Sequence, residues 1–112
     1  MYTEQDKREF LRAFTRILKD MKGRGPNNIF IKYLTGEFHV VIQGVVTDYE
    51  RYLVEGFGDE AFDTFTYYYK KDIKNIEKKF LELLDNKYGF ELYELEMDWV
   101  SDVFVYKFKI NG

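Results

Sequence analysis

Residues 90–110 of the chain run FELYELEMDWVSDVFVYKFKI. Apolar and charged residues alternate in both halves of this stretch, as they do in strands with one buried face and one solvated face. The first half, with Tyr93 on the apolar face, carries glutamates and an aspartate on the other, and the second half carries Lys107 and Lys109 there. The stretch therefore predicts a β-hairpin whose acidic and basic side chains pair across the strands.

A long helix is predicted immediately before this hairpin. Residues 59–88 place apolar side chains at every third or fourth position, which is the stripe of an amphipathic helix. We expect Asp59 to be the N-cap and Gly89 to follow the last turn. A helix of this length spans roughly 40 Å. We therefore expect one of its ends to extend past the sheet toward a second subunit.

A second hairpin and a short helix are predicted in residues 29–58. The strands cover residues 29–34 and 38–46, and Gly44 marks a bulge or a close backbone approach. Thr47 and Glu50 match a capping box, which predicts a short helix that ends near Glu55.

The N-terminal segment completes the predicted order of elements. Residues 3–21 carry one apolar helical stripe, with Thr3 as the N-cap and Gly23 after the last turn. The order α-β-β-α-β-β predicts one α+β domain over residues 1–112. We expect a four-stranded, mainly antiparallel sheet with helices packed on one face.

Composition narrows the range of partners and locations. The 112 residues contain no Cys and have a net charge of -3, which disfavours nucleic acid as a partner. No stretch approaches the roughly 18 apolar residues of a membrane span, and the N-terminal residues do not resemble a secretory signal. We expect a soluble, cytoplasmic protein that does not insert into membranes.

Residues able to perform catalysis are scarce. The chain has one Ser, Ser101, and one His, His39, and their spacing does not align them. Strand alternation separates Glu91 from the other acidic residues of the last hairpin, which predicts a solvated face rather than a metal site. We therefore predict no catalytic residues, no metal and no cofactor, and a protein that is not an enzyme.

Aromatic residues make up 20% of the chain, including ten Tyr. Tyr67, Tyr68 and Tyr69 follow one another on the predicted long helix, so only one of the three rings can face the core. Tyrosines with a packed ring and an exposed hydroxyl are common at interfaces. We predict a binding or assembly module that forms a homodimer, with Tyr67, Tyr68 and Trp99 at the interface.

The loop after the first helix suggests an alternative function. Lys22, Gly23, Arg24 and Gly25 combine two cations with two flexible backbone positions, which together could hold an anion. The same residues also suit a helix C-cap followed by a turn. The alternative hypothesis is a module that senses a small ligand or an anion at this loop.

Three motifs resemble those of a known bacterial family. They are the Gly23–Pro26 loop, the set Gly44, Thr47 and Glu50, and a long helix followed by a strand that reaches Asp98. Together they resemble the MpsC-like family, named for component C of a sodium-translocating membrane-potential-generating system and formerly a bacterial domain of unknown function. The resemblance implies the same small fold and a protein partner at a membrane system.

Overall fold

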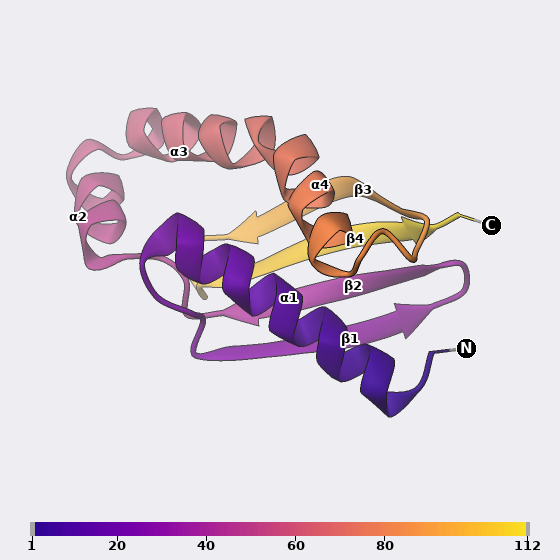
Figure 1. Ribbon diagram of the computed structural model, residues 1–112. Coiled ribbons are helices and arrows are strands. Elements are labelled where there is room, and N and C mark those ends of the chain that lie inside the picture. The colour runs from indigo at the N-terminus through magenta and orange to yellow at the C-terminus, as the bar shows by residue number, and fades with distance from the viewer. Residues whose placement is uncertain (1, 112) are drawn as a thin grey trace.

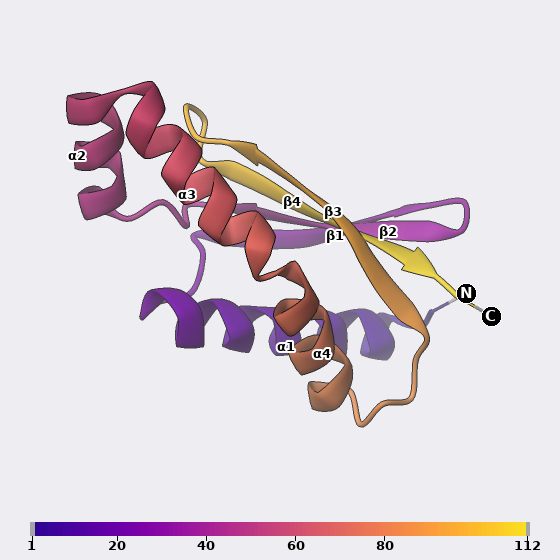
Figure 2. The same ribbon diagram turned by 90° about the horizontal axis from the view of Figure 1, so that it is seen from above.

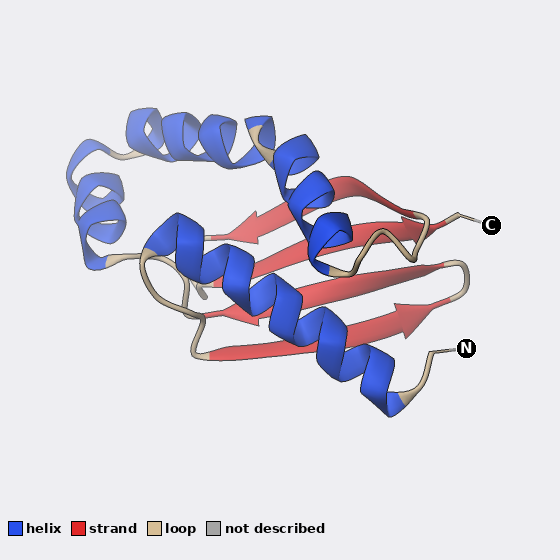
Figure 3. Cartoon of the chain, in the orientation of Figure 1, coloured by secondary structure: helices blue, strands red, loops and turns tan. Residues whose placement is uncertain are grey.

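The computed structural model describes residues 2–111 and confirms the α+β class. All strand pairs are antiparallel, and the spatial order of the strands is β1-β2-β4-β3. Helices α1 and α4 cover the same face of the sheet (Figures 1 and 3). The elements in chain order are α1 (Glu4–Lys22), β1 (Asn28–Leu34), β2 (Glu37–Gln43), α2 (Asp48–Phe57), α3 (Asp59–Lys71), α4 (Ile73–Leu83), β3 (Phe90–Asp98) and β4 (Val103–Ile110).

The core is an aromatic layer between the helices and the sheet. Phe10 and Phe14 of α1 are fully buried, and the Phe14 ring lies 4.8 Å from the ring of Tyr106 on β4. Phe38 and Phe108, on adjacent strands, stack with ring centroids 4.9 Å apart. The burial of apolar area by such rings is the main stabilising contribution to a domain of this size.

The outer face of the sheet carries the predicted pairs of opposite charges. Lys107 of β4 bonds Glu96 and lies 3.2 Å from Glu94, both on β3. The predicted alternation is wrong at the start of β3, because a bulge between Leu92 and Glu94 shifts the register. Tyr93 therefore faces outward, and its hydroxyl donates to Glu37 at 2.8 Å. Glu91 lies on this same outer face, opposite Lys109.

The predicted long helix is two helices. It breaks at Asp72, between α3 and α4, and α4 ends before Gly89 because Asp85 and Asn86 adopt positive φ angles of 59° and 55°. Asp and Asn tolerate this conformation better than most residues. The predicted N-cap is also wrong, because Gly58 occupies the capping position and Asp59 is the first residue of α3.

The helices α2 and α3 extend past one end of the sheet. Figures 1 and 2 show α2 and the beginning of α3 beyond the ends of the strands, in two perpendicular views, while the later part of α3 lies over the sheet. The molecule is elongated as a result, with principal extents of 45 × 23 × 22 Å. Part of α2 and α3 therefore has no sheet beneath it.

Candidate functional site

Residues 44–46, which follow β2, are held by the side chains of Arg24 and Asp102. Gly44 has a φ of 79° and turns the chain out of the sheet, so β2 ends three residues earlier than predicted. Arg24 donates to the carbonyl of Gly44 at 2.9 Å and to that of Val46 at 3.3 Å. Asp102 accepts from the backbone N–H groups of Val45 and Val46, both at 3.0 Å. The Arg24 guanidinium thus satisfies two backbone carbonyls.

Glu50 lies at the centre of a polar cluster beside this segment. Its Oε1 accepts from Lys22 Nζ at 2.5 Å, from the Thr47 N–H at 2.9 Å and from the Thr47 hydroxyl at 3.0 Å. Its Oε2 accepts from the Tyr69 hydroxyl at 2.8 Å. The Lys22 ammonium also lies 4.6 Å from the centre of the Tyr69 ring. One carboxylate therefore joins the end of α1, the start of α2 and the last turn of α3.

These contacts argue against an anion site at the Gly23–Pro26 loop. Lys22 has a side chain only 8% exposed and is neutralised by Glu50, while Arg24 is bound to backbone carbonyls. Gly23 caps α1 with a φ of 81°, and its N–H donates to the carbonyl of Lys19. Gly25 needs no unusual φ angle. The loop therefore acts as a C-cap and turn, and both of its cations already have partners within the fold.

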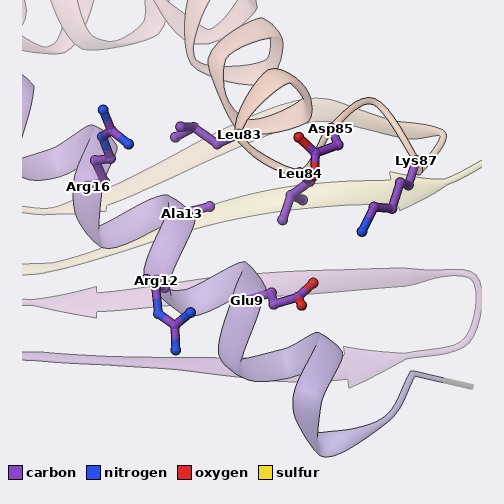
Figure 4. Close-up of a pocket in the computed structure, with 8 residues that line it drawn as sticks. All are labelled: Glu9, Arg12, Ala13, Arg16, Leu83, Leu84, Asp85 and Lys87. Carbon is purple, nitrogen blue, oxygen red and sulfur yellow. The ribbon is translucent and has the colours of Figure 1, made fainter.

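Two of the hollows on the helical side of the molecule are lined by several charged side chains. One, of about 380 Å³, borders Lys22, Glu50, Tyr68 and Asp72 at the junction of α3 and α4. The other, of about 310 Å³, lies between α1 and the end of α4 (Figure 4). Its lining mixes the charges of Glu9, Arg12, Arg16, Asp85 and Lys87 with the side chains of Ala13, Leu83 and Leu84.

The second hollow does not gather its positive charges around one point. In Figure 4 the side chains of Arg12 and Arg16 point in opposite directions from α1. Glu9 and Asp85 contribute negative charges to the same lining. A strong anion site requires donors that converge on a shared position, and the arginines do not provide this arrangement.

Exposed apolar side chains gather at the projecting end of the molecule, formed by α2, α3 and the tip of the β3–β4 turn. Among residues 2–111, the six most exposed large apolar side chains all lie on α2, on α3 or at the tip of the β3–β4 turn beside α2. Five of them are at least 60% exposed on α2 and α3 and define the α2–α3 aromatic surface: Tyr49, Tyr52, Phe57, Tyr67 and Tyr68. The sixth is Val100, at 93%.

The three tyrosines of α3 divide as the sequence predicts. Tyr69 is buried, and Tyr67 and Tyr68 are exposed. The predicted interface role of Trp99 is not supported, because its side chain is only 7% exposed. Its ring packs 5.3 Å from that of Phe104 and 5.7 Å from that of Tyr69. Trp99 belongs to the core beneath α3.

Two aspartates, Asp98 and Asp102, stabilise the β3–β4 turn and its contacts. Asp98 accepts from the N–H groups of Val100 and Ser101. Hydrogen bonding by the Ser101 side chain, and then by these two N–H groups, lowers the pKa of the Asp98 carboxyl. Asp102 has a φ of 55° and makes the longer-range contacts to the Gly44 segment. Sequence analysis missed Asp102, since its only local signal is its place in a turn.

The residue types that could perform catalysis, His39 and Ser101, lie far apart in the fold. His39 bonds Glu37 at 2.7 Å on the outer face and pairs with Lys107 in register, whereas Ser101 lies beyond the other end of β4. The four residue steps from Val103 to Lys107 alone separate them by about 13 Å. Within residues 2–111 no group of three or more His, Asp or Glu side chains is placed to hold a metal ion.

Comparison of the chain with protein-family models, with curated proteins and with solved structures gives no match. In the part of the chain that the structure describes, no helix has both the length and the apolar character needed to cross a bilayer.

Proposed function

We propose that this chain is a non-enzymatic binding and assembly module that forms a homodimer through its projecting end. The observation that carries the proposal is the α2–α3 aromatic surface, where five of the six most exposed large apolar side chains of residues 2–111 gather on two adjacent helices at one end of the molecule. Exposed apolar patches of this kind mark interaction sites on protein surfaces. Tyrosine is also among the residues that contribute most to binding at interfaces.

The resemblance to the MpsC-like family extends this proposal to a protein partner at a membrane system. The residues of two of the motifs lie together in the fold, since Arg24 contacts the carbonyl of Gly44, and Thr47 and Glu50 follow directly. These contacts have a structural role, which leaves the projecting end as the surface available for a partner. The cysteine-free composition supports a cytoplasmic location for the module.

Sedimentation equilibrium over a concentration series tests the proposal. We expect the mass to rise from monomer to dimer with concentration. The double variant Tyr67→Ser/Tyr68→Ser should remain monomeric at concentrations where the wild type is dimeric. Phe30→Ser is the matched control, because Phe30 is also an exposed aromatic residue but lies on β1, outside the proposed interface. A wild-type chain that stays monomeric at all concentrations would refute the proposal.

A further inference from the structure

The outward side of α3 carries an ordered pattern of charges. Glu60, Asp63, Tyr67, Lys71 and Lys74 are all exposed, and they follow one another at spacings of three or four residues. Side chains at this spacing lie along one stripe of a helix. Within α3 the stripe is acidic at its start, aromatic at Tyr67 and basic at Lys71, and Lys74 lies beyond the break at Asp72, in the first turn of α4.

The helix dipole explains only part of this pattern. Acidic residues in the first turn and lysines in the last turn of a helix are favoured in any helix by its macrodipole. The dipole does not account for Asp63, which lies beyond the first turn, or for two exposed tyrosines between the charged segments. An aromatic centre flanked by opposite charges is the composition of a surface that binds a partner.

Three of the four charges on this stripe have no ion-pair partner among residues 2–111, whereas the fourth, Lys74, lies 3.5 Å from Glu77 of its own helix. Among the ion pairs within 4.0 Å in residues 2–111, none includes Glu60, Asp63 or Lys71. The Lys71 ammonium lies 5.9 Å from the centre of the exposed Tyr67 ring. By contrast, the outer face of the sheet already pairs Lys107 with two glutamates of its own chain. The stripe is thus the better surface for a charged partner.

We propose that two copies of the chain pair through this stripe as antiparallel α3 helices, with the two-fold axis at Tyr67. This inference rests on the proposed homodimer and specifies its geometry. The axis places Asp63, four residues before Tyr67, against the partner's Lys71, four residues after it. Four residues correspond to about 6 Å along a helix. The same symmetry brings the two Tyr67 rings together at the centre.

The signs of the charges select this orientation over the parallel one. A parallel pair would place Asp63 against the partner's Asp63 and Lys71 against the partner's Lys71, and like charges at such positions repel. The opposite side of α3 is already occupied, because Tyr69 is buried against Trp99 and Phe104. Figures 1 and 2 show no other element of the chain over the outward side of α3.

Charge-reversal variants test the pairing. Asp63→Lys alone and Lys71→Asp alone should each weaken the dimer about tenfold, or about 1.4 kcal/mol, because each reversal turns two symmetry-related attractive pairs repulsive. The double variant Asp63→Lys/Lys71→Asp should recover wild-type affinity. An equimolar mixture of the two single variants should form a heterodimer tighter than either homodimer, since both of its pairs are again of opposite sign.

The control is Lys32→Asp, a charge reversal at an exposed position of β1 away from α3, and it should leave the dimer unchanged. A thermal melt of each variant establishes that it is folded. If the wild type dimerises and neither single reversal weakens the dimer, or if the double variant and the mixture fail to recover affinity, the antiparallel α3 pair is wrong and the homodimer must use another surface. If the wild type remains monomeric, the proposed function itself fails.

Discussion

Replacing Glu50 by Gln tests whether one carboxylate stabilises the junction of three helices. Glu50 accepts hydrogen bonds from Lys22 of α1, from Thr47 at the start of α2 and from Tyr69 of α3. Gln has nearly the same size, so the substitution removes the negative charge with little change in packing. Lys22 would then be left as a largely buried cation without a carboxylate, since its side chain is 8% exposed.

The expected loss is large for a domain of this size. Removing one partner of a buried ion pair costs about 3–5 kcal/mol. The Glu50 side chain retains 12% exposure, so we expect the lower end of that range. A loss of about 3 kcal/mol lowers the melting temperature of such a domain by roughly 10 °C. Such a loss is a substantial fraction of the roughly 5–15 kcal/mol free energy of unfolding of a typical protein.

Urea unfolding followed by tryptophan fluorescence measures this loss, because the single Trp, Trp99, is buried beneath α3. The matched control is Glu96→Gln, which removes an ion pair with Lys107 at a side chain that is 56% exposed. We expect less than about 1 kcal/mol there. Adding Lys22→Met to Glu50→Gln should recover part of the loss, since it removes the unpaired cation. If Glu50→Gln costs no more than Glu96→Gln, the proposed role of the cluster is wrong.

Three further predictions concern the backbone and the core. Arg24→Ala should cost about 2–3 kcal/mol in urea unfolding, because charged hydrogen bonds to two carbonyls are lost; an unchanged stability would contradict this role. Gly44→Ala should destabilise the fold more than Gly36→Ala. Both glycines have a positive φ, but only at Gly44 would an added Cβ clash with the Asn27 side chain. Equal melting temperatures of the two variants would refute this reasoning. Burial raises the pKa of Tyr106 in the folded protein. The stability that the protonated Tyr106 contributes is therefore fully present below the unfolded pKa of about 10 and is lost as the pH rises above it. A melting temperature that stays constant from pH 9 to pH 11 would contradict this.

Local signals in the sequence predicted the elements well. Both capping residues, Thr3 and Thr47, accept the expected bond from the third helical residue. The turn between β1 and β2 lies where Gly36 permits it, with a φ of 74°. These features depend on residues only a few positions apart, so the sequence alone contains the interactions that determine them.

The sequence is least informative where a residue's partner is distant in the sequence. The charges of Lys22 and Arg24 suggested a loop open to an anion, yet their partners lie 28 and 20 residues away. The bulge that turns Tyr93 outward places its hydroxyl against Glu37, 56 residues earlier. Residue type and local spacing do not reveal such contacts, which depend on tertiary packing.

The Glu50 cluster and the proposed dimer surface share helix α3. Tyr69 faces inward and bonds Glu50, whereas Tyr67 and Tyr68 face outward from the same turn. Any change that displaces Tyr69 will also displace the outward tyrosines. Glu50→Gln should therefore weaken the proposed dimer without changing a residue of its interface. Asp63→Lys should weaken the proposed dimer and leave the melting temperature of the monomer nearly unchanged. Measuring both quantities in both variants separates the contribution of the junction from that of the α3 surface.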